Sequence, residues 1–211
     1  MCSSIGLHLF RPETKRTHSY DMLLSSLDIP DIKLLSPEKH GDARGFFSEI
    51  YSQRSLEAAG IRQQFVQENC SFSAAQFTVR GLHWQSPPFV QAKLVQVLKG
   101  SILDVAVDLR RQSPWFGQHV AVELSATNWQ QLLIPVGFAH GFCTLEPDTM
   151  VLYKVDAYYS AEHDEGVRWD DPTIGIDWPA GKDQAVLSTK DQQLPLLADC
   201  EPPFTYTGAE P

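Results

Sequence analysis

The sequence predicts an all-β domain, a sandwich or barrel, on the strength of three observations. Strand-like apolar runs follow one another at short spacing from about residue 29 to residue 159, with turn residues between them. No long segment with a 3.6-residue period interrupts these runs, so alternating βαβ units are not expected. The chain has 211 residues, which is enough for one domain with a buried core.

The elements are expected in the following order. Residues 1–27 are polar and mixed without a clear period, which predicts a poorly ordered N-terminal extension, and residues 28–211 form the single domain with a loop-rich C-terminal tail. A helix is expected over residues 52–59, because Gly60 follows it at the C-cap position. Strands are expected at 30–35, 46–51, 64–71, 93–98, 102–109, 120–124, 131–135, 141–145 and 149–158. The strands 93–98 and 102–109 are expected to form a hairpin across residues 99–101.

Composition excludes several classes of function. The formal net charge of −9 argues against a nucleic-acid partner, which favours a basic surface. No segment has the length and apolarity of a membrane span, and the N-terminus lacks a secretory apolar core. The four cysteines lie far apart without a CxxC pair, so we expect neither a disulfide framework nor a zinc site. Reduced cysteines are typical of the cytoplasm, which is the expected location.

The strand at 102–109 has two chemically different faces. Leu103, Val105 and Val107 alternate with Asp104 and Asp108. The carboxylates either face water or lie inside the mouth of a barrel, where ligands bind. The pattern alone leaves both interpretations open.

Residues 80–93 bring a guanidinium, an imidazole and an ammonium together around a Pro-Pro turn. The three groups are Arg80, His83 and Lys93. A histidine beside Trp84 is often a packed structural residue, but its ordinary pKa near 6.5 suits proton transfer at neutral pH. The hypothesis is that His83 removes a proton from carbon while the cations hold an anionic substrate.

Three further side chains carry both a structural and a functional interpretation. His140 lies in Pro-x-Gly-x-x-His, which resembles the second half-motif of cupins, where the histidine is often a metal ligand. The first half-motif here reads His83-Trp84-Gln85 and lacks a second histidine, so no metal site is expected. Tyr153 is either a core residue or a general acid, and Arg44 is either a surface loop residue or a phosphate ligand.

Many ordered segments between about residues 29 and 195 together resemble the dTDP-4-dehydrorhamnose 3,5-epimerase family. These segments are Arg44-Gly-Phe-Phe, Arg80-Gly-Leu-His-Trp-Gln, Lys93-Leu-Val, Asp104-Val-Ala-Val-Asp-Leu-Arg110, Ser113-Pro-x-Phe-Gly117, Ile134-Pro-x-Gly-Phe-Ala-His-Gly-Phe142, Tyr153-Lys154 and Gly175-Ile-Asp-Trp-Pro179. The resemblance implies a cupin-type double-stranded β-helix, or jelly roll, with short peripheral helices. It also implies a homodimer that uses no metal or other cofactor.

The implied reaction is the epimerisation of dTDP-4-dehydro-6-deoxy-D-glucose at C3 and C5 to dTDP-4-dehydro-L-rhamnose, in dTDP-L-rhamnose biosynthesis. The C4 ketone acidifies both carbons, a base removes a proton, and an acid returns one to the opposite face. Enzymes of the same family that invert only C3 or only C5 are the alternative. Outside the family, the rivals are a metal-dependent cupin enzyme and a non-catalytic β-barrel that binds sugar nucleotides.

The resemblance also implies a role for individual residues. His83 falls on the base, Asp191 on its carboxylate partner, Tyr153 on the acid and Lys93 on the group that reaches the oxyanion. The residues implied in substrate binding are Arg44 and Arg80 at the diphosphate, Glu49 and Gln67 near the nucleoside, and Asn69, His140 and Tyr159 elsewhere in the pocket. Trp84, Gln96 and Cys70 depart from the family pattern, and none of them falls on the acid or the base.

Overall fold

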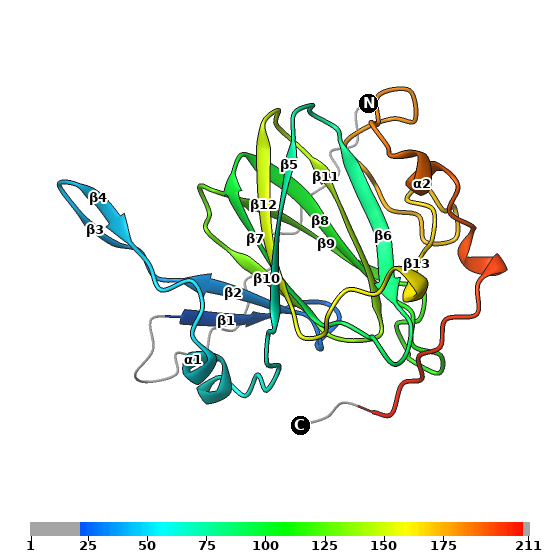
Figure 1. Ribbon diagram of the computed structural model, residues 1–211, viewed down its shortest axis with the longest axis horizontal. Coiled ribbons are helices and arrows are strands. Elements are labelled where there is room, and N and C mark those ends of the chain that lie inside the picture. The colour runs from blue at the N-terminus through cyan, green and yellow to red at the C-terminus, as the bar shows by residue number, and fades with distance from the viewer. Residues whose placement is uncertain (1–21, 209–211) are drawn as a thin grey trace, which may run out of the picture.

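The computed structural model describes residues 22–208, and residues 1–21 of the predicted extension 1–27 lie outside them. The fold is the predicted jelly roll, in which two antiparallel sheets face each other (Figure 1). In spatial order, the six-stranded sheet consists of β1 (Met22–Ser26), β2 (Lys33–Pro37), β10 (Gln131–Ile134), β7 (Lys93–Lys99), β12 (Thr149–Val155) and β5 (Gln67–Ser73). The five-stranded sheet consists of β13 (Asp164–Gly166), β6 (Val79–Gln85), β11 (Phe138–Thr144), β8 (Ser101–Asp108) and β9 (His119–Ser125).

The remaining elements are short and peripheral. The predicted helix is confirmed as α1 (Gln53–Ala58), which begins at Ser52, where the side chain accepts a hydrogen bond from the Ser55 N–H. Its last residue is followed closely by Gly60, at a positive φ of 83°. The others are α2 (Thr189–Gln192) and the 3₁₀ turns η1 (Ala161–His163) and η2 (Leu197–Asp199). None of the helices in residues 22–208 has the length and apolarity to cross a bilayer.

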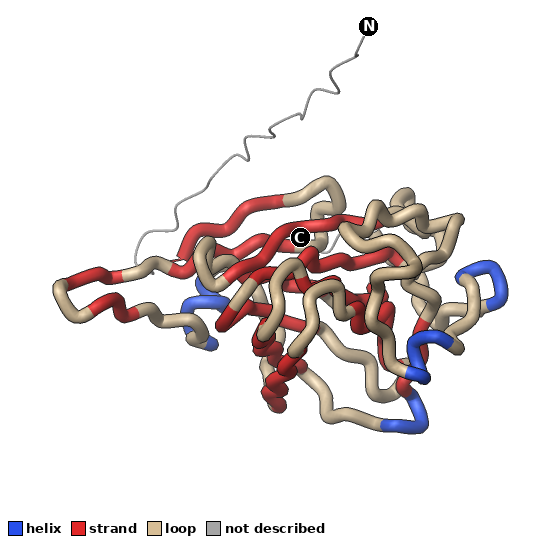
Figure 2. The backbone as a smooth tube through the Cα atoms, turned by 90° about the horizontal axis from the view of Figure 1, so that it is seen from above, coloured by secondary structure: helices blue, strands red, loops and turns tan. Residues whose placement is uncertain are grey.

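A small hairpin projects from the body of the domain. It consists of β3 (His40–Asp42) and β4 (Gly45–Phe47), and both Figure 1 and Figure 2 show it reaching away from the two sheets. The sequence predicted a loop over the first of these strands and a longer strand, 46–51, over the second. The two strands pair only with each other, and the contact of the hairpin with the body of the domain is made by Phe46, which packs edge-on against Trp129 before β10.

Two other predictions are wrong. Residues 22–26 of the expected extension form strand β1, which pairs along its whole length with β2. The expected hairpin of β7 and β8 does not exist, because β7 pairs with β10 and β12 while β8 pairs with β9 and β11. The chain passes from one sheet to the other at Gly100, which has a positive φ of 77°. Both strands are apolar and largely buried, and each is completed by strands distant in the sequence that a local turn signal cannot reveal.

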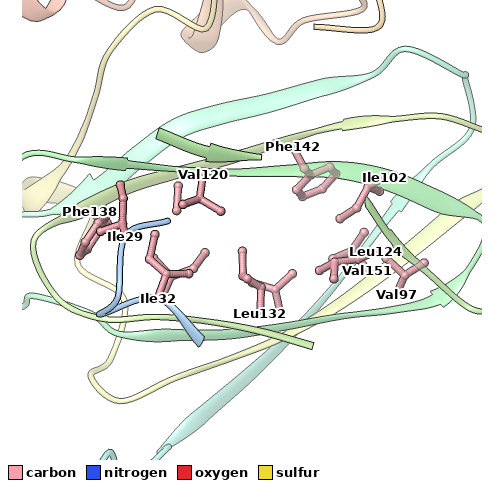
Figure 3. Packing of buried hydrophobic residues seen from close by; sticks show 13 residues of the cluster. Ile29, Ile32, Val97, Ile102, Val120, Leu124, Leu132, Phe138, Phe142 and Val151 are labelled. Atoms are coloured by element: carbon pink, nitrogen blue, oxygen red, sulfur yellow. The ribbon is translucent and has the colours of Figure 1, made fainter. Parts of the chain in front are cut away.

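The main core lies between the two sheets. Figure 3 shows its side chains filling the space between them, and they come from both sheets and from the loop after β1: Ile29, Ile32, Val97, Ile102, Val120, Leu124, Leu132, Phe138, Phe142 and Val151. Together they exclude water from one end of the barrel interior. The other end is left to polar side chains.

A second core lies on the outer face of the five-stranded sheet. Val105 and Val107 of β8 pack there beneath Ile174, Leu197 and Phe204 of the C-terminal segment. This cover buries the apolar face of β8, so its opposite face, with Asp104 and Asp108, points to the barrel interior. The interior interpretation of these carboxylates is therefore the one that the structure supports.

Candidate active site

A cavity of about 420 Å³ opens at the polar end of the barrel. Both sheets and α2 contribute to its wall, which includes Ser71, Arg80, His83, Lys93, His140, Phe142, Tyr153, Lys190 and Asp191. A second hollow of about 260 Å³ shares His83, Lys93 and Tyr153 with the first. It adds Gln67, Asn69, Trp84, Gln85, Gln91, Tyr159 and Asp164. The shared residues place the two hollows next to each other.

An irregularity in β6 turns both Arg80 and His83 into this cavity. In a regular strand, two residues three positions apart point to opposite faces. Here His83 lies opposite His140 of β11 but Arg80 lies opposite Phe142, so β6 carries one extra residue between the two pairs. The extra residue lies near Gly81, whose φ is 125°. The bulge therefore places a cation and an imidazole on the same inner face.

His83 is oriented by a carboxylate that comes from far away in the sequence. Its Nε2 lies 2.7 Å from Oδ1 of Asp191 on α2. Burial acts to raise the pKa of the Asp191 carboxyl, but hydrogen bonds from His83, Ser188 and the Gly81 N–H outweigh it, so the pKa lies below the ordinary value. An ionised carboxylate only accepts, so Nε2 carries the hydrogen and Nδ1 is the ring nitrogen that can take a proton.

Lys93 and Tyr153 come from the opposite, six-stranded sheet. Burial raises the pKa of the Tyr153 phenol; the positive charge of Arg80 opposes this shift and the negative charge of Asp164 adds to it. The phenol therefore keeps its proton at neutral pH, as a general acid must. Burial lowers the pKa of Lys93 to about 8, against the negative charges of Asp164 and Asp104.

Other predicted site residues line the same space. Arg80 is anchored by hydrogen bonds from its guanidinium to the Ser73 hydroxyl (3.2 Å) and the Phe72 carbonyl (3.0 Å). Gln67 donates to Asn69 at 2.9 Å, and both lie on the inward face of β5 beside β12. The Tyr159 hydroxyl donates to Asp164 at 2.9 Å. Together these side chains give the cavity a polar mouth.

The structure does not bring Arg44 or Glu49 to this cavity. Arg44 lies in the turn of the projecting hairpin, where its side chain is 90% exposed and pairs with Asp42. Glu49 follows the hairpin and accepts a hydrogen bond from the Ser55 hydroxyl of α1. Neither residue can therefore bind substrate in the cavity of its own chain, contrary to the prediction, because the hairpin carries both away from the barrel.

Comparison with known proteins identifies the family. The family model described as dTDP-4-dehydrorhamnose 3,5-epimerase matches residues 26–199. The chain belongs to this family. A dTDP-4-dehydrorhamnose 3,5-epimerase of Sinorhizobium fredii is 49% identical over 186 residues, which cover 88% of this chain and 95% of the relative.

Two solved structures of epimerases of the same type share the fold. The enzyme from Bacillus anthracis, solved with TDP and PPi bound, is 52% identical with a TM-score of 0.80, and the match covers 83% of this chain and 99% of that one. The dTDP-6-deoxy-D-glucose-3,5-epimerase of Legionella pneumophila, in complex with dTDP-4-keto-L-rhamnose, is 42% identical with a TM-score of 0.84. That match covers 89% of this chain and all of the other.

Several residues of this epimerase-family site escaped the sequence analysis. Ser71 continues the alternation of Gln67 and Asn69 along β5, and its buried hydroxyl at the cavity has no hydrogen-bond partner among residues 22–208. Lys190 precedes Asp191 and pairs with Asp164 at 2.5 Å. The period-2 pattern of β5 could have revealed Ser71, but no local signal pairs Lys190 with Asp164.

No metal centre is evident among the side chains of residues 22–208. Within that range, no group of three or more histidine, cysteine, aspartate or glutamate side chains is arranged to hold a metal ion. The two cavity histidines, His83 and His140, each direct Nε2 to a carboxylate of Asp191 or Asp104.

The bulge in β6 leads to a prediction about Gly81. A Cβ at this position would lie 2.6 Å from Cα of Gly141 and 2.8 Å from the carbonyl oxygen of His140, at a φ that side chains rarely adopt. We expect Gly81→Ala to lower the free energy of unfolding by about 2 kcal/mol or more. Denaturant unfolding measures this loss. Gly181→Ala is the matched control, because the nearest atom to its added Cβ is 3.9 Å away and no positive φ is required, so its stability should stay near wild type. A Gly81→Ala protein as stable as this control would contradict the packing argument.

Proposed function

We propose that the protein is an isomerase that converts dTDP-4-dehydro-6-deoxy-D-glucose to dTDP-4-dehydro-L-rhamnose by epimerisation at C3 and C5, in dTDP-L-rhamnose biosynthesis. One observation carries the proposal beside family membership. The histidine with a carboxylate partner, His83, and the protonated phenol, Tyr153, stand on opposite sheets of one cavity. Inversion of a carbon needs a base on one face of the sugar and an acid on the other.

The two inversions follow the same steps. The C4 ketone makes the protons at C3 and C5 acidic, and Nδ1 of His83 removes one of them while Asp191 stabilises the imidazolium. The Lys93 ammonium donates a hydrogen bond to the developing enolate oxygen. Tyr153 then returns a proton to the opposite face of the carbon. Before the second inversion, His83 gives its proton to water and the Tyr153 phenolate takes one from water. The ketone of the substrate supplies the acidity, so these steps require no metal or redox cofactor.

The rest of the site suits a sugar nucleotide. The Arg80 guanidinium at the cavity mouth is placed to bind the diphosphate, as arginine does in paired hydrogen bonds. Gln67, Asn69 and the exposed ring of Tyr159 line the adjoining hollow, which is suited to the nucleoside. The TDP and PPi bound to the Bacillus anthracis enzyme support this assignment.

Arg44 and Glu49 are assigned to a neighbouring subunit of a homodimer. Phe46 and Phe47 on the same hairpin are 52% and 72% exposed, an unusual exposure for two adjacent phenylalanines. If a second copy of the chain covered these two rings, Arg44 would come within reach of the diphosphate site of that second copy. The proposed location is cytoplasmic, with no nucleic-acid or membrane partner. The three cysteines within the described residues are free, which fits a reducing compartment.

The first test follows solvent deuterium by NMR during incubation with dTDP-4-keto-6-deoxy-D-glucose in deuterated water. The wild-type protein should exchange the protons at C3 and C5 and accumulate the inverted product. His83→Ala should lose exchange at both carbons by at least about a hundredfold, because one base serves both. Exchange at a single carbon would instead identify a 3-only or 5-only epimerase, and no exchange would contradict an epimerase. Substantial C5 exchange in His83→Ala would refute the single base.

Tyr153→Phe separates the acid from the base. The variant keeps His83 and Lys93 and loses only the hydroxyl that reprotonates the enolate. We expect net epimerisation to slow about tenfold or more beyond any loss of deuterium wash-in. The two rates are measured in one NMR time course. Equal losses in both rates would count against the acid role.

The dimer assignment predicts that two impaired variants restore each other. Arg44→Ala should weaken substrate binding by about tenfold or more, through the loss of a charge-assisted contact. In a mixed dimer, the Arg44→Ala chain supplies an intact His83 and the His83→Ala chain supplies an intact Arg44. Mixing the two proteins at low substrate concentration, with subunit exchange, should therefore raise activity above either variant alone. Activity that stayed at the sum of the separate variants would place Arg44 outside the partner's site.

A further inference from the structure

Asp104 is a fully buried carboxylate beside the cavity, and the mechanism above gives it no part. It lies at the centre of β8, opposite Phe142 of β11 and Val122 of β9. His140 lies two positions away along β11, on the same inner face. Both Asp104 oxygens approach His140 Nε2, at 3.0 and 3.1 Å. A carboxylate with no exposed surface needs such partners, because burial of an unpaired charge is costly.

We propose that Asp104 is a positioning residue of the active site. It holds the His140 ring so that Nε2–H points to β8 and Nδ1 is available to a sugar hydroxyl. Its negative charge also favours the ammonium form of the buried Lys93. The proposal rests on the proposed epimerase function for the identity of the sugar. The arrangement of the two side chains itself does not depend on it.

The state of His140 follows from its surroundings. Burial lowers the pKa of His140; Asp104 opposes this shift, and the positive charges of Lys93 and His83 add to it. The ring is therefore neutral at neutral pH and holds one hydrogen. A carboxylate accepts hydrogen bonds, so that hydrogen resides on Nε2. Nδ1 is left as an acceptor and makes no hydrogen bond to any part of the chain that the structure describes.

An acceptor at this point selects for a particular group on the ligand. His140 lines the cavity, so Nδ1 can accept a hydrogen bond from a sugar hydroxyl but has no hydrogen to offer a ketone. A hydrogen bond to the ketone must then come from another side chain, and Lys93 is the donor proposed above. Asp104 in this way separates the positions at which a hydroxyl and a carbonyl are bound.

Lys93 is the second group that Asp104 affects. Burial lowers the Lys93 pKa to about 8, and the negative charges of Asp164 and Asp104 limit the fall. Without Asp104 the pKa would be lower still, and the ammonium would lose its proton at a lower pH. The titratable groups around Lys93 are Asp164 on β13, Asp104 on β8, Lys190 on α2, His140 on β11, His83 on β6 and Tyr153 on β12.

The tautomer of His140 gives a test that does not depend on activity. ¹⁵N NMR of the imidazole nitrogens should show the Nε2–H tautomer in the wild-type protein. In Asp104→Leu, no group at this position can accept from Nε2–H, so the tautomer should no longer be fixed and a measurable Nδ1–H population should appear. Asp164→Asn is the matched control, since Asp164 also acts on Lys93 but makes no contact with His140, and it should keep the Nε2–H tautomer. Nε2–H as the only tautomer in a folded Asp104→Leu protein would overturn the proposal.

The pH dependence of the rate tests the second part. The form active in catalysis carries the Lys93 proton, so activity is present below its pKa and is lost as pH rises through about 8. Asp104→Asn should shift this alkaline loss to lower pH by about one unit, and Asp164→Asn should shift it in the same direction. A folding defect alone would reduce the amount of active enzyme without changing the pH at which activity is lost. An alkaline loss at the wild-type pH in Asp104→Asn would therefore overturn the charge role. If the wild-type protein lacks epimerase activity, the proposed function fails, while the tautomer experiment still decides the role of Asp104.

Discussion

The close approach of β6 and β11 is the constraint on which the site depends. Gly81 and Gly141 face each other with no room for a Cβ on either, and the extra residue of β6 is accommodated there. Because of this bulge, Arg80 and His83 point into the same cavity although their spacing would separate them in a regular strand. The groups proposed to bind the anion and to abstract the proton are thus brought together by backbone geometry.

The two sheets divide the chemistry between them. The five-stranded sheet provides His83, His140 and Asp104, while the six-stranded sheet provides Lys93 and Tyr153. A ligand between the sheets would therefore meet the proposed base on one side and the proposed acid on the other. The apolar core fills the far end of the space between the sheets. The polar end therefore occupies only part of the interior and is partly shielded from water.

The C-terminal segment has a structural and a functional role at once. It covers the outer face of the five-stranded sheet with Ile174, Leu197 and Phe204, and so allows β8 to direct its carboxylates inward. The same segment carries Asp191 on α2 to His83. Three buried or half-buried carboxylates, Asp104, Asp164 and Asp191, then surround the cationic and imidazole groups of the cavity. Each carboxylate pairs with a different side chain: Asp104 with His140, Asp164 with Lys190 and Asp191 with His83.

The sequence by itself determined the all-β class, the helix at residues 53–58 and most strands, because period-2 alternation and glycine turns are local properties. The motifs from Arg44 to Asp191 determined the family. Only the tertiary structure decided which strands pair: β7 and β8 adjoin in sequence but belong to different sheets, since strand pairing depends on the burial of distant segments. It likewise decided that Asp104 points inward, that Lys190 meets Asp164, and that Arg44 stands apart from the cavity. Such contacts join residues far apart in the chain, and no local pattern records the distance between them.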